Sequence, residues 1–373
     1  QDIFDLDIKN IFSKQWVFVG HISRIPNYGD YFLFNIGKES IIIVRDNNNS
    51  VHAHFNVCRH RGSKICLENE GNSKVLICPY HAWTYNLDGS LKGARLMGEN
   101  FNKKDWRLHK CNSKIFEGLI FINLSDKPND FEEFISPTKK FIEFHGLSDA
   151  KIAHRQYYPT NGNWKLTLDN FHECYHCQPS HPEYCQVHDK DYIIAYGAGS
   201  NTGPASEKFD NILAEWNKKV KNMGHLTGEF YETEFNDYSR SAERTPLKEG
   251  MFTETKSGKP ISKLMGKFKD YDRGYTSVGT SPFNSLLMCN DFATLFTFIP
   301  VSPLYTQVEL MWLVHKEAEE GRGYNLDEMK WMWDVTTIAD KRIIENNQKG
   351  VLSNKYVPGP LSKLKPAKDR STC

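Results

Sequence analysis

The sequence predicts an α+β protein with two domains, an antiparallel β domain and a mixed domain of helices and strands. The chain of 373 residues is longer than one small core needs. From Asp30 onward, short alternating apolar runs are separated by turn residues, which is typical of antiparallel strands. Beyond Asp126, helical periodicity and longer strands are mixed, as in an α+β domain.

The β domain is assigned to residues 30–125. Its predicted strands are YFLFNIG, SIIIVRD, VHAHFNV, KVLICPY and GLIFINL, with turns at residues 46–50 and at Asp88-Gly89. Apolar residues of Leu6–Trp16 recur at helical spacing, so a helix is expected before this domain.

The second domain is assigned to residues 1–29 and 126–373. Its expected elements are helices at Phe131–His145 (with a break at Pro137), Trp164–His176 and Leu326–Gly350, and strands at Leu286–Val301 and Tyr305–His315. Residues 197–208 are rich in Gly, Ser and Asn, so a mobile loop near an entrance is expected there.

Composition excludes several function classes. The formal net charge is +1 and charges of both signs are interspersed, so no nucleic-acid surface is expected. Apolar runs reach only strand length, and no leader pattern opens the chain, so neither a membrane span nor a secretory signal is expected. The nine cysteines show no spacing of a disulfide ladder. Cysteine beside histidine indicates metal chemistry in a reducing compartment, and cytoplasm is expected.

The first metal motif lies in the β domain. Cys58-x-His60 and Cys78-x₂-His81 each combine one thiolate with one imidazole on a short loop. A Rieske [2Fe–2S] centre is held by two Cys on one iron and two His on the other. A structural Cys₂His₂ zinc site is the alternative, but zinc fingers place both cysteines at one end. The mixed loops therefore favour the two-iron cluster.

The second motif contains two overlapping metal patterns. His172-Glu173-x-x-His176 matches the zinc-protease motif H-E-x-x-H, although so short a match is often accidental. The competing interpretation pairs His176, at the end of the predicted helix, with His181 in the turn that follows. Together with one carboxylate these form a facial triad, which suits a non-haem Fe(II) oxygenase. We favour this pair and interpret His172 as an ordinary helix histidine.

The third ligand must be a distant carboxylate. The helix WMWDVTTIADKRIIENNQKGV offers Asp340, with Asp334 and Glu345 as alternatives. Asp340 shares a largely apolar face with Trp333 and Ile344, where an acid is costly unless it is paired or bound to metal. Glu173 precedes His176 by three residues, and a carboxylate there can orient a ligand histidine by accepting its second N–H.

The cluster loops NVCRHRGSKIC and LICPYHAWTYNLDG resemble the Rieske loops of ring-hydroxylating-type oxygenases. In the respiratory Rieske proteins each loop carries a further cysteine for a disulfide, and Ser63 and Tyr80 stand at those positions here. Trp83 replaces a serine that donates a hydrogen bond to the cluster in those proteins. Fewer such hydrogen bonds imply a potential near the low end of the Rieske range.

The resemblance covers nearly the whole chain, through NWKL, ECYHC, SHPE, WLVHKEA and YVPGPLS. It is nearest to N-demethylating members of the family such as glycine betaine monooxygenase and stachydrine demethylase, although SPFNSLLMCND departs from the former. It implies a Rieske domain and a helix-grip (START-like) catalytic domain. It also implies mononuclear iron on His176, His181 and Asp340. In a homotrimer, Glu173 would then bridge to His81 of the neighbouring subunit.

Such enzymes use O₂ to hydroxylate an N-methyl carbon, and the product loses formaldehyde. The resemblance implies NAD(P)H electrons from a separate flavin and iron–sulfur reductase. A quaternary ammonium substrate requires an aromatic box. The candidate walls are Tyr192, Tyr196, Phe283, Phe292, Phe296 and Phe298. The alternative functions are an aromatic-ring hydroxylating dioxygenase alpha subunit and, more remotely, a Rieske electron-transfer protein.

Overall fold

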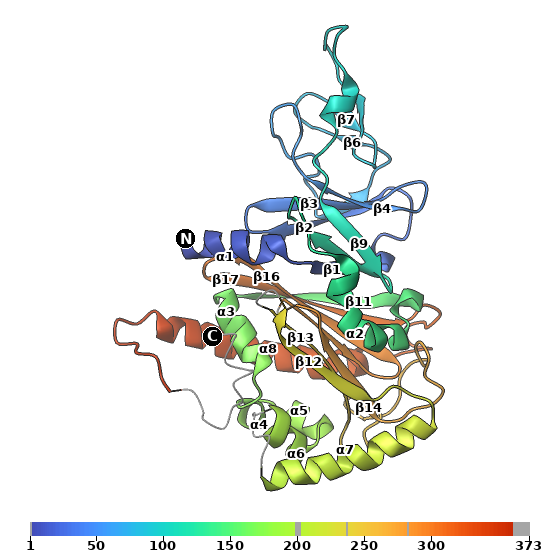
Figure 1. Cartoon of the computed structure of the whole chain (residues 1–373), viewed down its shortest axis with the longest axis vertical. Coiled ribbons are helices and arrows are strands. Elements are labelled where there is room, and N and C mark those ends of the chain that lie inside the picture. The colour runs from blue at the N-terminus through green and yellow to red at the C-terminus, as the bar shows by residue number, and fades with distance from the viewer. Residues whose placement is uncertain (1, 198–202, 236–237, 282, 361–373) are drawn as a thin grey trace. The chain divides into compact units, whose positions relative to one another are not determined.

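A computed structural model describes residues 2–197, 203–235, 238–281 and 283–360. The chain divides into two compact units, Gln1–Phe131 and Glu132–Cys373 (Figure 1). The predicted division differs at the start, because residues 1–29 belong to the first unit rather than to the second. The reason is strand pairing: Val17 and Phe18 pair with Ile122 and Phe121 in one antiparallel ladder.

The first unit consists mainly of short antiparallel strands, as predicted. Its elements are α1 (Asp2–Asn10), η1 (Phe12–Lys14), β1 (Val17–His21), η2 (Ile22–Arg24), β2 (Asp30–Ile36), β3 (Glu39–Arg45), β4 (Val51–Phe55), β5 (Glu70–Asn72), β6 (Leu76–Ile77), β7 (Thr84–Tyr85), β8 (Leu91–Gly93), η3 (Lys103–Trp106), β9 (Asn112–Phe116) and β10 (Leu119–Asn123). They form sheets with the orders β1-β10-β9, β4-β3-β2-β5 and β6-β7-β8.

The predicted turns of this unit have clear local causes. Between β3 and β4, the side chain of Asp46 accepts backbone hydrogen bonds from Asn48 (2.9 Å) and Ser50 (2.8 Å). Between β7 and β8, Gly89 has a φ of 85°, and a Cβ atom there would lie 2.6 Å from the ring of His54. Only glycine meets both requirements, so Asp88-Gly89 turns the chain as its sequence indicates.

The second unit contains one large sheet and most of the helices. Its elements are α2 (Phe131–His145), η4 (Leu147–Asp149), β11 (Ala150–Thr160), α3 (Trp164–His172), α4 (Cys177–Ser180), α5 (Pro182–Val187), α6 (Lys190–Tyr192), η5 (Ile193–Gly197), α7 (Pro204–Asn222), β12 (Gly228–Phe235), β13 (Tyr238–Pro246), β14 (Gly274–Gly279), β15 (Asn284–Met288), β16 (Phe292–Ser302), β17 (Tyr305–His315) and α8 (Leu326–Val351).

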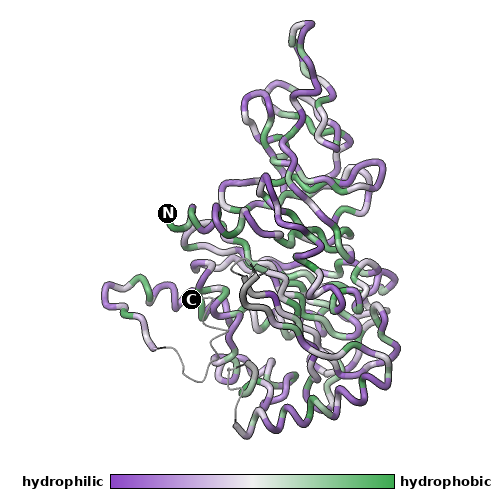
Figure 2. The backbone as a smooth tube through the Cα atoms, viewed as in Figure 1, coloured by the Kyte–Doolittle hydropathy of each residue, from purple (hydrophilic) through white to green (hydrophobic). Residues whose placement is uncertain are grey.

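The seven strands of this unit form an antiparallel sheet in the order β11-β17-β16-β15-β14-β13-β12. Helix α8 packs against β11, α3 and α5, so the long helix and the sheet enclose the core expected of a helix-grip domain (Figure 1). Apolar segments follow the inner strands, whereas α7 carries many hydrophilic residues (Figure 2). Among the described helices, none has the length and apolarity required to cross a membrane.

Four predicted elements of the second unit differ in detail from the structure, and three of them concern element bounds. The expected strand Leu286–Val301 is two strands, β15 and β16, separated by a turn. Residues 204–208 begin helix α7 rather than belonging to a loop, and residues 198–202 lie outside the described part. The helix expected to reach His176 ends at His172, and Glu173 is already extended with φ −126°.

Helix α2 continues through Pro137, where a break was expected. A proline removes the N–H that would donate to the carbonyl four residues earlier, here that of Glu133. The guanidinium of Arg240 donates to this carbonyl (2.9 Å) and to that of Phe134 (2.6 Å). A side chain from β13 therefore replaces the missing backbone donor, and the helix remains intact.

Candidate metal centres

The two loops with Cys58, His60, Cys78 and His81 share one backbone pattern. The carbonyl of Cys58 accepts from the N–H of Gly62 (2.9 Å), and that of Cys78 accepts from the N–H of Ala82 (3.0 Å). Gly62 (φ 75°) and Ala82 (φ 57°) are both left-handed. Each cysteine thus begins an equivalent tight turn that brings a histidine back toward it.

The donor atoms of these loops suit a [2Fe–2S] cluster. Cys58 and Cys78 are free thiols, each 2% exposed, within the apolar core of the unit. The Nδ1 atoms of His60 and His81 are buried and have no hydrogen-bond partner, and the two rings lie 4.6 Å apart. Buried polar atoms are normally satisfied. Two thiolates and two unpartnered imidazole nitrogens are the donor set of a Rieske centre.

A tyrosine that the sequence analysis did not single out contacts this donor set. The hydroxyl of Tyr85 lies 3.3 Å from Sγ of Cys58 and accepts a hydrogen bond from the N–H of Arg59 (3.1 Å). Trp83, which replaces the serine donor of other Rieske proteins, stacks on the ring of His60 at 4.8 Å. The sulfur of Cys58 therefore has a hydroxyl partner, and Tyr85 rather than residue 83 provides it.

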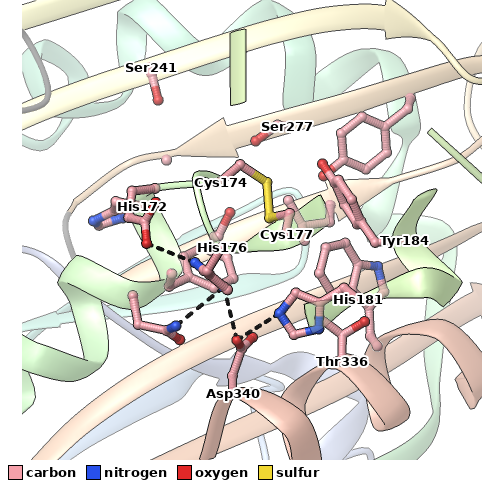
Figure 3. A pocket seen from close by; sticks show the side chains of 18 of the residues that line it. His172, Cys174, His176, Cys177, His181, Tyr184, Ser241, Ser277, Thr336 and Asp340 are labelled. Atoms are coloured by element: carbon pink, nitrogen blue, oxygen red, sulfur yellow. Dashed lines mark hydrogen bonds and ion pairs between the residues drawn. A yellow bond between two sulfur atoms is a disulfide. The ribbon is translucent and has the colours of Figure 1, made fainter. Parts of the chain in front are cut away.

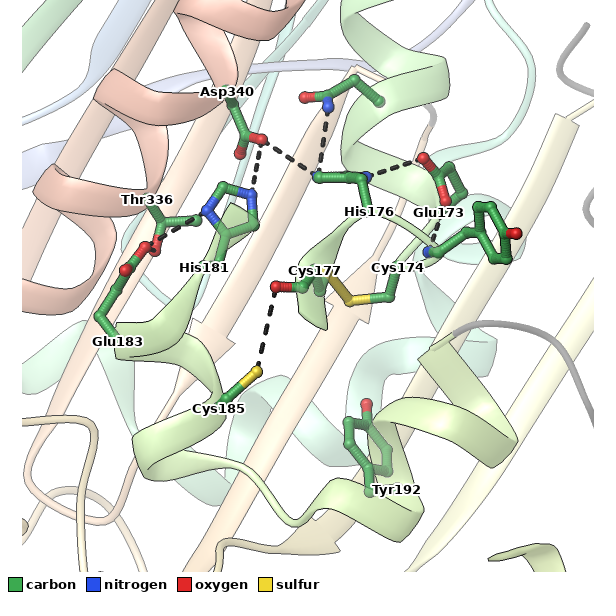
Figure 4. Close-up of a disulfide and its surroundings, with 12 residues drawn as sticks. Glu173, Cys174, His176, Cys177, His181, Glu183, Cys185, Tyr192, Thr336 and Asp340 are labelled. Atoms are coloured by element: carbon green, nitrogen blue, oxygen red, sulfur yellow. Dashed lines mark hydrogen bonds and ion pairs between the residues drawn. A yellow bond between two sulfur atoms is a disulfide. The ribbon is translucent and has the colours of Figure 1, made fainter. Parts of the chain in front are cut away.

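The second cluster of donors comprises His176, His181 and Asp340. Their ligand atoms all lie within 4.8 Å of one another, and no other such group of three occurs among the described residues. Nε2 of His176 lies 3.2 Å, and Nε2 of His181 2.9 Å, from Oδ1 of Asp340 (Figure 4). Turns on either side of α4 supply the histidines, and α8 supplies the aspartate. Two imidazoles and one carboxylate suit a non-haem iron.

Each histidine of this group has a carboxylate near its other ring nitrogen. Glu173 accepts from Nδ1 of His176 at 2.7 Å and from the N–H of Tyr175 at 2.5 Å. The position of Glu173 comes from this turn and not from a shared helix face, which corrects the expected geometry. Burial disfavours the imidazolium, but hydrogen bonds to Asp340 and Glu173 outweigh it and raise the pKa of His176 to about 9.

Three neighbours of the triad were not singled out from the sequence. Glu183 lies 3.3 Å from Nδ1 of His181 and accepts a hydrogen bond from Thr336 at 3.0 Å. The amide of Asn170 lies 3.3 Å from Nε2 of His176. Glu183 is only 7% exposed in the structure. The signal available from the sequence is an acid two residues after the proposed ligand His181.

The rival ligands are occupied elsewhere. Asp334 accepts a hydrogen bond from Tyr158 at 2.5 Å, and Glu345 accepts from the backbone N–H of Asn161 at 3.0 Å. His172 lies outside the group of three donors, because α3 ends there and cannot carry both histidines of an H-E-x-x-H helix. The geometry therefore favours Asp340 over both rival acids and gives no support to the protease pattern.

A cavity of about 240 Å³ adjoins the triad, and His176, His181 and Asp340 lie on its wall (Figure 3). Of the predicted pocket residues, Tyr192 lines it, and the side chain of Tyr196 lies outside the described part. The prediction that four phenylalanines line the pocket is corrected, because these side chains are buried in the core and are absent from the cavity wall: Phe283, Phe292, Phe296 and Phe298. The aromatic wall instead comprises Phe171, Tyr184, Tyr192, Tyr275 and Trp333.

A disulfide between Cys174 and Cys177 also lies on this wall. The sequence analysis did not expect it. The turn that follows Glu173 brings the two Cα atoms to 4.8 Å, within the range that a disulfide spans. The bond closes a short loop around His176, so it restricts the segment that positions this histidine.

Comparisons with known proteins agree with this arrangement. Residues 15–106 match the family described as Rieske [2Fe-2S] domain, and residues 147–368 match the ring hydroxylating alpha subunit (catalytic domain). The glycine betaine monooxygenase oxygenase subunit of Pseudomonas aeruginosa is 35% identical, with 97% of this chain and 83% of that protein covered. The carnitine monooxygenase oxygenase subunit of Escherichia coli (strain K12) is 36% identical, with 49% of this chain and 50% of that protein covered.

Solved structures show the same fold. A quaternary ammonium Rieske monooxygenase superposes with a TM-score of 0.70 at 23% identity, covering 95% of this chain and 84% of that chain. A naphthalene 1,2-dioxygenase superposes with a TM-score of 0.68 at 20% identity, covering 95% of this chain and 79% of that chain. Because both amine and ring oxygenases have this fold, these structures do not discriminate between substrate classes.

Proposed function

This chain belongs to the ring-hydroxylating oxygenase alpha-subunit family with a Rieske domain, and from that premise we propose that it removes an N-methyl group from a small quaternary amine. The observation that carries the proposal is the triad of His176, His181 and Asp340 on the wall of a small cavity lined by aromatic rings and a carboxylate. The triad supplies the oxygenase chemistry, and the aromatic rings supply recognition of a cation that cannot donate hydrogen bonds.

The residues around the triad have defined tasks. His176, His181 and Asp340 would hold the mononuclear iron, which supplies O₂ activation when bound. Glu173 accepts the Nδ1–H of His176, so Nε2 is left as the ligand atom. Glu183, held by Thr336, places a negative charge 3.3 Å from Nδ1 of His181.

The cluster loops would deliver electrons to this site. Cys58, Cys78, His60 and His81 would hold the [2Fe–2S] centre, and we infer that a separate NAD(P)H-dependent flavin and iron–sulfur reductase reduces it. Relatives described as oxygenase subunits support such a division of labour. The thiolate ligands suit a reducing compartment, so we propose the cytoplasm as the location, where the Cys174–Cys177 disulfide would be open to reduction.

The proposed reaction converts the N-methyl carbon into a hydroxymethyl group. One oxygen atom of O₂ enters the C–H bond, and two electrons and two protons reduce the other atom to water. The hydroxymethyl ammonium then breaks its C–N bond: the nitrogen keeps the electron pair, the hydroxyl proton leaves, and formaldehyde departs. The amine product has one methyl group fewer.

We further propose a head-to-tail homotrimer in which His81 of one subunit meets Glu173 of the next. A heterologous contact whose rotation closes forms such a ring. Large apolar side chains are exposed at the cluster loops and beside Glu173: Val57 (38%), Ile77 (51%), Tyr80 (58%) and Tyr175 (74%). Exposed apolar side chains of this kind are suited to an interface between subunits.

Demethylation assays test the proposal. Purified protein with a reductase, NADH and O₂ should release formaldehyde from glycine betaine, carnitine or choline, in proportion to substrate consumed. The rival function is that of a ring dioxygenase. It is favoured by the similarity to the anthranilate 1,2-dioxygenase large subunit of Acinetobacter baylyi, which is 31% identical over 49% of this chain. A cis-diol or catechol product from benzoate or anthranilate, without formaldehyde from any amine, would overturn the proposal in favour of that rival. An electron-transfer role would leave the triad without a task.

A further inference from the structure

The cavity contains a carboxylate that has no role in holding metal. Glu243 on β13 lines the cavity and is partly buried. Its Oε1 accepts a hydrogen bond from Tyr192 (2.9 Å) and its Oε2 from Tyr231 (2.5 Å). Because both oxygens accept, the arrangement suits an ionised carboxylate. Within the described part of the chain no Lys, Arg or His forms an ion pair with Glu243.

Strand alternation places Glu243 on the cavity face of the sheet. Ser241 and Glu243 lie two residues apart on β13, as do Tyr275 and Ser277 on β14, and all four line the cavity. Glu243 pairs directly with Ser277 across the two strands. Small serines on this face leave space, and Tyr275 and Glu243 border that space. Ser241 and Ser277 are shown in Figure 3.

The cavity offers little to a second, negative group. Among the described residues that line it there is no Lys or Arg. The internal segments outside the described part, AGSNT (198–202), ND (236–237) and Pro282, contain neither. A substrate carboxylate would therefore meet the charge of Glu243, with no Lys or Arg among the described lining residues to offset it.

The energetics of burial favour a cation here. A partly buried carboxylate is costly without an opposite charge, and tyrosine hydroxyls offset only part of that cost. Desolvation accordingly raises the pKa of Glu243, while the bonds from Tyr231 and Tyr192 oppose this shift. An ammonium group among Tyr184, Tyr192 and Tyr275 would gain both the rings and the carboxylate.

We propose that Glu243 is a specificity-determining residue that selects a singly charged quaternary ammonium alcohol over a zwitterionic betaine. This inference rests on the proposed N-demethylation. The carboxylate attracts the ammonium group into the cavity and repels a second carboxylate carried by the substrate. Size also fits a small ligand, because drug-sized ligands occupy pockets of roughly 300–1,000 Å³.

The experiment compares choline with glycine betaine, which share a trimethylammonium group and differ in a hydroxymethyl against a carboxylate group. Formaldehyde release at pH 8 gives kcat/KM for each. The wild-type enzyme should favour choline at least tenfold. Glu243→Gln should reduce this ratio at least tenfold, mainly through KM for choline. Glu229→Gln is the matched control. Glu229 on β12 pairs with Glu243 on β13, but it is exposed and does not line the cavity.

A second variant covers the case in which Glu243→Gln does not fold. Ser277→Lys places an ammonium group opposite Glu243 and should shift the preference toward glycine betaine. A wild-type preference for glycine betaine, or an unchanged ratio in Glu243→Gln, would overturn the inference. If no amine yields formaldehyde, the proposed function fails separately. Binding of choline and of glycine betaine is then measured by quenching of Trp333 fluorescence, with Trp333→Phe as the blank. Tighter binding of choline supports the inference, and tighter binding of glycine betaine overturns it.

Discussion

At the scale of single residues, Glu173 connects the sequence motif with the proposed electron path. Its carboxylate holds the ring of His176 through a 2.7 Å hydrogen bond, and it lies beside the exposed Tyr175. A group that both orients a ligand and lies near the surface is suited to meet a neighbouring subunit. This proposed double task distinguishes Glu173 from Glu183, which is buried beside His181.

Glu173→Gln should retain both metals and the trimer but lose electron transfer. The amide keeps size and one acceptor while it removes the charge that holds His176 and the partner's cluster ligand together. We expect the reduced cluster not to re-oxidise when substrate and O₂ are added, as followed by single-turnover stopped-flow absorbance. Glu183→Gln is the control: iron affinity should fall about 10–100-fold, yet the iron-loaded enzyme should re-oxidise. Wild-type oxidation rates in Glu173→Gln would contradict the bridging role.

Tyr85 should raise the reduction potential of the cluster. Its hydroxyl, 3.3 Å from Sγ of Cys58, stabilises the extra negative charge of the reduced state. Tyr85→Phe removes this donor. A net difference of about 1 kcal/mol corresponds to a decrease of about 40 mV for one electron. Protein-film voltammetry measures this shift, and Tyr80→Phe on the exposed loop is the control. A potential that is equal in Tyr85→Phe and the wild type would exclude the hydrogen bond as a determinant.

At the scale of elements, α2 shows how a distant strand can preserve a helix. Pro137 deprives the carbonyl of Glu133 of its usual donor, and Arg240 on β13 donates to it instead. Arg240 is 3% exposed, and its bond to the carbonyl of Phe134 is buried whereas that to the carbonyl of Glu133 is partly buried. Helix α2 and strand β13 are thereby linked by hydrogen bonds that no local rule anticipates.

Arg240→Ala should destabilise the second unit by about 1–3 kcal/mol, because it removes the buried bond to the carbonyl of Phe134 and the donor that replaces the missing N–H at Glu133. Pro137→Ala in the same chain should recover part of this loss, since it restores the backbone N–H toward Glu133. Calorimetric melting temperatures of the two single variants and the double variant measure the coupling. Strict additivity of the two changes would show that Arg240 does not compensate for the proline.

At the scale of the whole molecule, the two proposed metal centres belong to different compact units. The cluster ligands lie in the first unit, and the triad lies in the second. Cys78→Ser should therefore abolish the [2Fe–2S] centre and its red-brown colour while the mononuclear site persists. The variant should hold one iron per chain, where the parent holds three.

Metal analysis and acid-labile sulfide measure this outcome. The reciprocal control is His181→Ala, which should retain two irons, the sulfide and the Rieske spectrum but lose turnover. Zinc in place of iron and sulfide in the parent would instead support the structural zinc alternative for Cys58 and Cys78. Loss of all iron in Cys78→Ser would show that the units do not fold independently.

The sequence by itself determined the class of the fold, the family and both metal motifs. Periodicity located the strands of the first unit and helix α8, because alternation and helical spacing are local properties. The metal motifs were visible because each combines rare residue types within a few positions: Cys58 with His60, Cys78 with His81, and His176 with His181. Asp340 required two further arguments, the cost of an acid on an apolar helix face and the family resemblance.

Only the tertiary structure decided what surrounds these motifs. The end of α3 at His172, the position of Glu173 and the Cys174–Cys177 disulfide depend on a turn whose geometry no periodicity encodes. The cavity wall likewise comes from helices and strands that are distant in sequence. Its aromatic side chains are Phe171, Trp333 and three tyrosines, and none of the four predicted phenylalanines is among them. Glu243 belongs to this wall because register pairs β13 with β14. Local patterns report which side of a strand faces inward, whereas only packing determines whether that side meets core or cavity.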